Sequence, residues 1–359
     1  MFRLVLSLLV AMIGAGPAHA QPANDTSRTG QSADWLVLPY ASYAPDTKIA
    51  GGLVVGYYRP EQPNGTASSV QATFTGTQRR QLIAKMSPEL YLRDGLWRVQ
   101  GELQVSHYPN SYFGIGGETP KSAEESYTAR YVLLDGTAQR RIRSNLRVGP
   151  RVFVRADAVR TSGETRGDIA QGRVAGAGGG VTAGLGLSLF WDARNSLYYP
   201  TTGTYAEVVT TLHSAAWGSD YTFGHLKTDV RTYHPLGIGV LTGQLYTEAV
   251  MGTAPFQQLP LLGGSSQMRG YREGRFRDSV YWTAQAEYRM PLFWRFKATV
   301  FASVGEVGPR VGPELVEHVE AAVGIGGRLR LTDDGVHGRL DLAWSPTGIE
   351  PYVSLGEAF

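Results

Sequence analysis

The chain contains no cysteine among its 359 residues, so it can form neither a disulfide framework nor a thiolate metal site. After the N-terminal segment it also has no run of 18 apolar residues, which excludes a membrane-spanning helix. Excess charge is nearly absent too. The formal net charge of +3 is weak evidence for an acidic partner, and we expect several arginines to pair locally inside a cavity.

Motifs for catalysis are equally scarce. The sequence has no His-Glu-x-x-His pair and no Gly-x-Ser-x-Gly elbow, although six histidines follow residue 20. "TDDG" (332–335) offers two carboxylates, which are too few ligands for a metal and are typical of a hairpin turn. We therefore expect a protein that is not an enzyme, without catalytic residues, metal or cofactor. A histidine–serine pair on neighbouring strands is the arrangement that such a search could overlook.

The N-terminus predicts export. "MFRLVLSLLVAMIGAGPAHAQ" has one arginine, an apolar run and Ala18-His19-Ala20, the layout of a secretory signal peptide spanning residues 1–20. The alternative, a membrane anchor, needs about 20 apolar residues, and the run before Pro17 is shorter. Residues 21–34 are interpreted as a short polar periplasmic tail.

Most of the remaining chain alternates with a period of two. In "YWTAQAEYRM" (281–290) one face carries Trp282 and Tyr288, and the other carries Gln285, Glu287 and Arg289. "GGRLRLTDDGVHGRLDLAW" (326–344) repeats the pattern. A soluble sandwich would bury the apolar face, whereas a transmembrane barrel turns it toward lipid. The signal peptide, the 19 tyrosines and 7 tryptophans, and the lack of helix-period segments favour the barrel.

The alternation predicts an all-β protein, an antiparallel transmembrane barrel of about 16 strands that fills residues 35–359. Short turns alternate with longer segments, which we assign to the extracellular side: 110–125, 162–173, 254–280 and 306–318. The strands are expected near 35–43, 48–59, 66–77, 79–93, 96–109, 126–142, 145–161, 176–192, 203–215, 219–234, 238–252, 281–291, 296–305, 319–331, 336–345 and 350–359.

A basic, glycine-rich segment, "LPLLGGSSQMRGYREGRFRD" (259–278), interrupts this pattern. A phosphate-binding loop would need Gly-Lys-Ser/Thr opening a helix, and no helix follows. Nucleic-acid binding would need an exposed basic module, which a barrel does not offer. Two interpretations remain: a solvated surface loop touching lipopolysaccharide or water, or a loop held inside the barrel, where its arginines would need acidic partners.

Several ordered motifs resemble the BamA/TamA-like superfamily of outer-membrane barrels, also called bacterial surface antigens. They are MRGY (268–271), "LFWDARNSLYYPTTGTY" (189–205), "NSYFGIGGET" (110–119), "AEYRMPL" (286–292) and a last strand ending in Phe359. The resemblance runs from about Leu38 to Phe359 and is strongest after residue 186.

The resemblance implies that 254–280 is the sixth extracellular loop and folds back into the lumen. Arg269, with Gly270 and Tyr271, would then be the loop arginine that meets acidic residues of the wall. Glu287 matches the acid of the following strand. The family's usual aspartate in an aromatic-x-Asp-x-Gly run is replaced by Ser303 in "FASVG", and Asp341 is a possible substitute.

Two further sites follow from the resemblance. The strand–turn–strand motif, with Asp192, Arg194, Asn195, Pro200 and Gly203, would lie at the periplasmic rim. We interpret Asp192 and Arg194 there as turn chemistry of the Asx type rather than as a catalytic acid and its partner. Phe359 would be the C-terminal assembly signal.

The same resemblance suggests a function. The residues between the expected cleavage site and Trp35 are too few for a substrate-receiving POTRA domain, so we expect a short, barrel-only member without POTRA domains. It would serve protein or lipid translocation or assembly in the outer membrane of a Gram-negative bacterium. Its expected partners are outer-membrane lipids and lipopolysaccharide, the barrel assembly machinery that inserts it and a separate periplasmic partner, but no nucleic acid. The alternative is a passive gated pore, surface antigen or scaffold without insertase activity.

Overall fold

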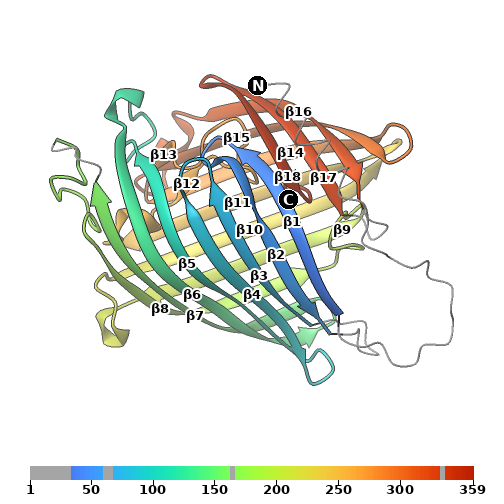
Figure 1. The fold of residues 1–359 in the computed structure, drawn as a ribbon, viewed down its shortest axis with the longest axis horizontal. Coiled ribbons are helices and arrows are strands. Elements are labelled where there is room, and N and C mark those ends of the chain that lie inside the picture. Colours follow the sequence, from blue (N-terminus) through green and yellow to red (C-terminus); the bar gives the residue numbers. More distant parts are fainter. Residues whose placement is uncertain (1–33, 60–67, 162–165, 332–335) are drawn as a thin grey trace.

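The computed structural model describes residues 34–59, 68–161, 166–331 and 336–359. The expected signal peptide (1–20), the tail up to residue 33 and the turn 332–335 lie outside these residues. Within them the chain forms a closed barrel of sixteen antiparallel strands, and this confirms the all-β fold predicted from the sequence (Figure 1).

The barrel strands follow the chain order, and each pairs with its neighbours. They are β1 (Asp34–Ala44), β2 (Lys48–Tyr58), β3 (Ser69–Thr77), β4 (Leu82–Leu92), β5 (Trp97–Tyr112), β6 (Glu125–Arg143), β7 (Leu146–Thr161), β8 (Gly179–Asp192), β9 (Gly203–His213), β10 (Phe223–Leu236), β11 (Gly239–Gly252), β14 (Val280–Pro291), β15 (Phe296–Gly308), β16 (Glu320–Arg330), β17 (His337–Ser345) and β18 (Gly348–Leu355).

The connecting segments carry short elements. A two-stranded sheet of β12 (Leu261–Leu262) and β13 (Phe276–Arg277), which the sequence did not predict, lies in the long segment between β11 and β14. The 3₁₀ helices of the described residues are single turns at η1 (Lys121–Ala123), η2 (Ala215–Trp217), η3 (Phe256–Gln258) and η4 (Pro313–Val316).

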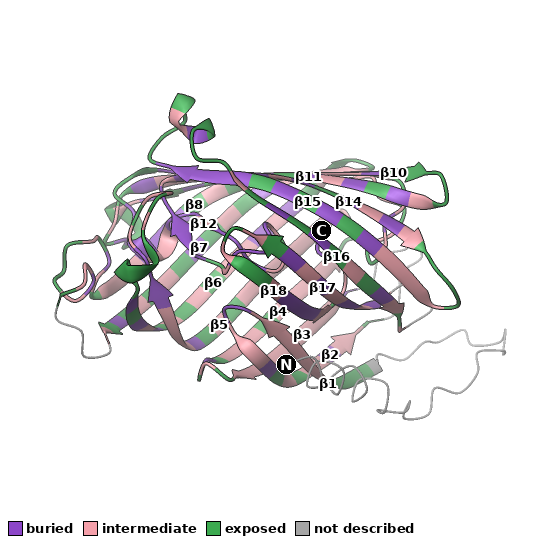
Figure 2. Cartoon of the chain, turned by 90° about the horizontal axis from the view of Figure 1, so that it is seen from above, coloured by how far each residue is buried: buried purple, intermediate pink, exposed green. Residues whose placement is uncertain are grey.

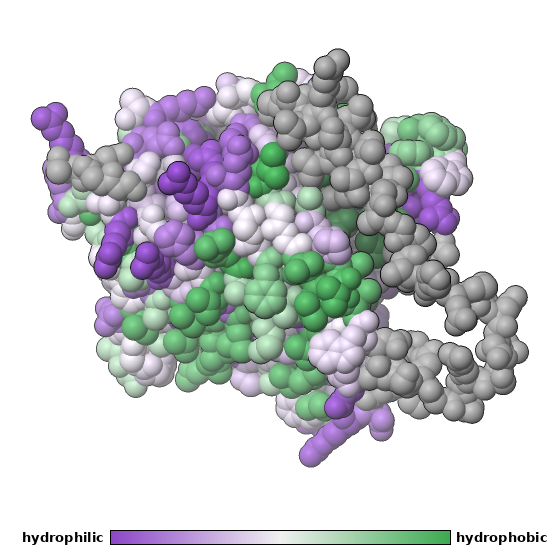
Figure 3. Space-filling view, in the orientation of Figure 1, coloured by the Kyte–Doolittle hydropathy of each residue, from purple (hydrophilic) through white to green (hydrophobic). Residues whose placement is uncertain are grey.

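Burial alternates along many of the strands, as expected for side chains that point in turn to the inside and the outside of the barrel (Figure 2). On β14, Gln285, Glu287 and Arg289 are buried inward, whereas Trp282 and Tyr288 face outward and are partly exposed. Apolar side chains form a broad band over the outer face, with hydrophilic ones gathered toward one end (Figure 3). The apolar face is therefore the outer one, as in a barrel surrounded by lipid.

The last strand ends earlier than expected. We predicted a strand over 350–359, but β18 ends at Leu355, and this prediction was wrong for the final four residues. Gly356 adopts a left-handed φ of 81° and turns the chain away from the sheet. The Glu357 carboxylate then lies 2.7 Å from the Arg328 guanidinium inside the barrel. The last four residues therefore leave the sheet, and Glu357 makes an ion pair inside the barrel instead of continuing the strand.

The closure between the first and last strands is short. β1 and β18 are in register at one pair, Tyr43 with Val353. By contrast, β1 pairs with β2 along its whole length, from Asp34 opposite Tyr58 to Ala44 opposite Lys48. Much of one edge of β1 therefore has no partner in β18, and Trp35 in this region is 71% exposed.

Candidate functional site: a buried charge network inside the barrel

The segment between β11 and β14 enters the barrel and positions its arginine there. The β12–β13 pair brings the two ends of this segment together, with Leu262 opposite Phe276. Met268 and Tyr271 are fully buried in one apolar cluster with them. Apolar packing thus carries Arg269 toward the inner wall, where its side chain is 0% exposed.

Arg269 makes two short ion pairs with the wall. Its Nη2 lies 2.6 Å from the Glu287 carboxylate of β14, and its Nη1 lies 2.6 Å from the Asp341 carboxylate of β17. Both carboxylates are completely buried. The structure therefore brings together the three charged residues that the sequence singled out, and Asp341 occupies the second acidic position that Ser303 leaves vacant.

An aromatic ring completes the Arg269 site. The guanidinium lies 3.5 Å from the ring centroid of Phe301, a geometry favourable for cation–π attraction. A Cβ atom at Gly324 on the neighbouring strand would come within 2.2 Å of that ring, so the absence of a side chain there makes room for it. Ser303 is buried on β15, the strand of Phe301, and its hydroxyl has no hydrogen-bond partner among the described residues.

The residues beside Arg269 fasten the segment to the last three strands. The Gly270 N–H donates to the Tyr352 hydroxyl of β18 at 2.8 Å, and the Ser345 hydroxyl donates to the Gly270 carbonyl at 2.8 Å. The Tyr271 hydroxyl donates to the Glu320 carboxylate of β16. Gly270 has a φ of 110°, and a Cβ atom there would lie 3.0 Å from the Ala322 Cβ. This close, left-handed approach suits glycine alone.

Three more arginines and one more carboxylate extend the network. Arg289 Nε lies 2.7 Å from Glu287, and Arg328 bridges Asp341 at 2.5 Å and Glu357 at 2.7 Å. Arg339 Nε lies 3.6 Å from Asp341. Four guanidinium groups thus meet three side-chain carboxylates with almost no solvent access, so these seven side chains together carry one surplus positive charge, and Arg289 also donates to the main-chain oxygen of Phe359.

Sequence reasoning missed part of this network. Strand alternation placed Arg328 and Arg339 on the polar face of the segment 326–344, and this could have predicted that both face the lumen. No comparable signal existed for Glu357, because a continuing strand would not bring it to Arg328. The network joins the inserted loop, β14, β16 and β17 to the residues that follow β18. Any movement of the loop therefore changes the electrostatic environment of the chain's last residues.

The predicted strand–turn motif forms a compact turn between β8 and β9, at the end of the barrel opposite the β11–β14 connection. The Asp192 carboxylate accepts the Arg194 N–H at 3.1 Å, the geometry of an Asx turn, and also pairs with its guanidinium at 2.8 Å. The Asn195 side chain accepts the N–H of Thr201 at 2.9 Å, next to the buried Pro200. Gly203 has a φ of 105°, and a Cβ there would lie 2.1 Å from the Ala193 carbonyl oxygen.

An aromatic residue connects that turn to the network. The Tyr199 ring lies 4.8 Å from the His337 ring and 5.8 Å from the Arg289 guanidinium. Phe359 is buried beside them, and its carbonyl oxygen accepts a hydrogen bond from Arg289 at 3.0 Å. The turn and the chain's last residues therefore pack together inside this end of the barrel.

The inserted segment also contacts the loop between β5 and β6. The Gly116 N–H donates to the Arg277 carbonyl at 2.8 Å, and Arg275 donates to the Thr119 carbonyl at 2.7 Å. Glu273 is exposed to solvent and lines a cavity of about 260 Å³ together with residues of the barrel wall such as Phe153 and Tyr246. This enclosure and the Asp46 charge raise the pKa of the Glu273 carboxyl to about 7. Hydrogen bonds therefore join the two loops to each other.

Sixteen antiparallel strands closed around a polar, loop-filled interior define an outer-membrane type of β-barrel. The Omp85 superfamily domain matches residues 64–345, and the chain belongs to that superfamily. This confirms the resemblance inferred from the sequence. No curated protein sequence matches the chain significantly.

Two solved structures illustrate the shared fold. BamA from Haemophilus ducreyi lacking POTRA domains 1–3 is similar with a TM-score of 0.66 at 15% identity, over 91% of this chain and 70% of that one. CdiB from Acinetobacter baumannii is similar with a TM-score of 0.58 at 12% identity, over 90% of this chain. The match spans 60% of the length of CdiB. At these identities the likeness concerns the fold.

Two further features are absent from the described residues. No helix there is long and apolar enough to cross a membrane. In the same part of the chain, no group of three or more His, Cys, Asp or Glu side chains is arranged to hold a metal ion.

Proposed function

We propose that this protein is an integral outer-membrane barrel that translocates or assembles protein or lipid by opening between β1 and β18. The observation that carries the proposal is the short closure, with one register pair at Tyr43 and Val353. An unpaired strand edge presents free N–H and C=O groups, which can template a client strand. The apolar side chains beside this edge, such as Trp35 and Val37, are exposed.

The charge network supports a controlled opening. Arg269 bonds to β14 and β17, and Gly270 bonds to Tyr352 of β18 itself. We propose that the loop lies on the extracellular side and locks the last strands while it remains inserted. In this role the protein is non-enzymatic, is itself inserted by the barrel assembly machinery, and works among outer-membrane lipids and lipopolysaccharide with a separate periplasmic partner.

Cysteine crosslinking tests the opening, because the chain has no native cysteine. The variant Tyr43→Cys/Val353→Cys places a disulfide across the closure, and Ser42→Cys/Ala50→Cys is the matched control across the fully paired β1–β2 junction. We expect the first disulfide to cause an envelope defect that reductant reverses, and the control to cause none. Quantitative locking at Tyr43 and Val353 without any defect in cells would refute the proposal.

A gated pore is the second candidate, and one observation favours it. The lumen holds a polar cavity of about 360 Å³ lined by charged side chains that include Glu102, Asp135 and Arg151. Such a hydrated interior would conduct ions once the inserted loop moved aside. Conductance in planar bilayers that persists unchanged in the locked Tyr43→Cys/Val353→Cys variant, together with normal growth, would favour the pore over the opening barrel.

A further inference from the structure

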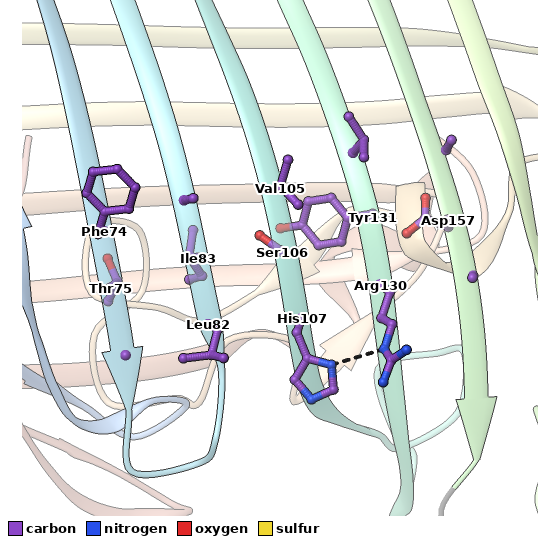
Figure 4. Close-up of a pocket in the computed structure, with 15 residues that line it drawn as sticks. Phe74, Thr75, Leu82, Ile83, Val105, Ser106, His107, Arg130, Tyr131 and Asp157 are labelled. Carbon is purple, nitrogen blue, oxygen red and sulfur yellow. Dashed lines mark hydrogen bonds between the residues drawn. The ribbon is translucent and has the colours of Figure 1, made fainter.

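An apolar groove lies on the outer face of the barrel over β3–β7, away from the charge network (Figure 4). Its volume is about 820 Å³, within the 300–1,000 Å³ typical of small-molecule sites. Small outward-facing residues, Gly76, Ala84 and Ala156, alternate there with the larger apolar Phe74 and Val132. The floor of the groove lies over the small residues, and the larger residues form its sides.

One end of the groove is basic. Arg130 is exposed on the outer face, and its Nε donates to His107 Nδ1 at 3.3 Å (Figure 4). An imidazole that accepts this bond carries no negative charge, so His107 does not compensate the charge of Arg130. Arg160 is also exposed on the outer face, diagonal to Arg130 because it pairs with Thr128. Neither arginine forms an ion pair with any described residue.

The two arginines lie at the edge of the apolar band that is nearest the start of β6 and the end of β7. On the side away from the strand tips, the outward neighbours Val132 and Ala156 are apolar, and on the tip side Thr128 is polar. The cations therefore lie at the level where lipid headgroups begin, and the apolar groove extends from them toward the middle of the membrane. An unpaired guanidinium at that depth needs an anionic partner or water.

We propose that this groove binds a phosphorylated, multi-acylated glycolipid of the outer leaflet. Its acyl chains would fill the groove, and one phosphate would contact Arg130 with Arg160 beside it. Guanidinium groups suit phosphate because two parallel N–H donors match its oxygens. This inference rests on the proposed function for the orientation of the barrel and for the lipid surroundings, and it adds a specific site for one glycolipid. Its failure would leave the opening at β1–β18 untouched.

Lipid binding to the purified full chain tests the site. Native mass spectrometry would follow titration with lipid A, with lipid A stripped of phosphate, and with phosphatidylglycerol. We expect one tightly bound lipid A, binding about tenfold weaker in Arg130→Gln, which corresponds to one lost charge-assisted contact. Arg140→Gln is the matched control, because Arg140 is exposed on the same face at the other end of β6 and should leave binding unchanged.

A second variant keeps the charges and blocks the groove. Ala156→Phe should also weaken lipid A binding, and the heat-dependent gel shift of a folded barrel verifies folding of each variant. Equal weakening by Arg130→Gln and Arg140→Gln, equally tight binding of the dephosphorylated lipid or of phosphatidylglycerol, or complete competition by millimolar inorganic phosphate would each overturn the proposal. A dimer that Ala156→Phe dissociates would identify the groove as a contact between two copies instead.

Discussion

Because arginines outnumber side-chain carboxylates around Arg269, we predict that Glu287→Gln destabilises the barrel more than Arg269→Gln does. In Glu287→Gln, the side-chain carboxylates that face the four buried arginines would be those of Asp341 and Glu357 alone. Removing one partner of a buried ion pair costs about 3–5 kcal/mol, because it leaves uncompensated charge. Arg269→Gln instead leaves three arginines against three carboxylates. Its cost should be nearer to the 1.5–3 kcal/mol of charged hydrogen bonds.

Two readouts separate barrel stability from loop position. Urea unfolding in detergent, followed by the gel mobility of the folded barrel, should show Glu287→Gln as the less stable variant by about 1–2 kcal/mol. Trypsin cleavage at Arg272 and Arg275 reports release of the inserted segment. We expect faster cleavage in both variants, because each removes an ion pair of Arg269 to the wall.

The double variant completes the test. Arg269→Gln/Glu287→Gln restores the surplus of one positive charge found in the native network. Its destabilisation should therefore be smaller than the sum of the two single effects, as expected for coupled neighbours. If the effects simply add, or if Arg269→Gln destabilises the barrel more than Glu287→Gln, then charge balance does not govern this network. A loop that stays as protease-resistant as in the native protein would refute the anchoring role of Arg269.

Two further predictions concern the same loop. Gly270→Ala should release the loop at a cost of about 1–3 kcal/mol, because it combines a left-handed φ with a close contact to Ala322; unchanged trypsin resistance at Arg272 would contradict this. Because the pKa of Glu273 is raised to about 7, the inserted loop holds a proton there that the free carboxyl releases near its ordinary pKa of 4.5. The inserted state should therefore lose stability as the pH rises from about 4.5 through 7. Cleavage should be slower at pH 6 than at pH 8, and Glu273→Gln should remove most of that difference.

Much of the barrel could be predicted because strands have a period of two. Alternation alone assigned Glu287 and Arg289 to one face of β14, and the structure places both inside. The turn signals between apolar runs likewise predicted about sixteen strands. Boundaries were less accurate: β5 continues to Tyr112 rather than ending near residue 109, since pairing with β6 stabilises the longer strand.

The candidate site depended on a different kind of information. Alternation cannot show which lumen-facing side chains meet, because that depends on how the barrel closes. Asp341 lies 72 residues after Arg269 in the chain, and the two meet only because β17 passes opposite the inserted loop. The stacking of Arg269 on Phe301 likewise requires the space above Gly324 on the next strand.

The sequence by itself determined the strand pattern, the inward and outward faces and the arginine expected to enter the lumen, because these depend on local periodicity and on motifs. Only the tertiary structure decided that β1 and β18 meet at one register pair, and that the chain turns inward after Leu355 so that Glu357 reaches Arg328. It also decided where small outward-facing residues of β3, β4 and β7, beside larger ones of β5 and β6, leave a groove. These features arise from pairing between segments distant in sequence, whose energies no local pattern records.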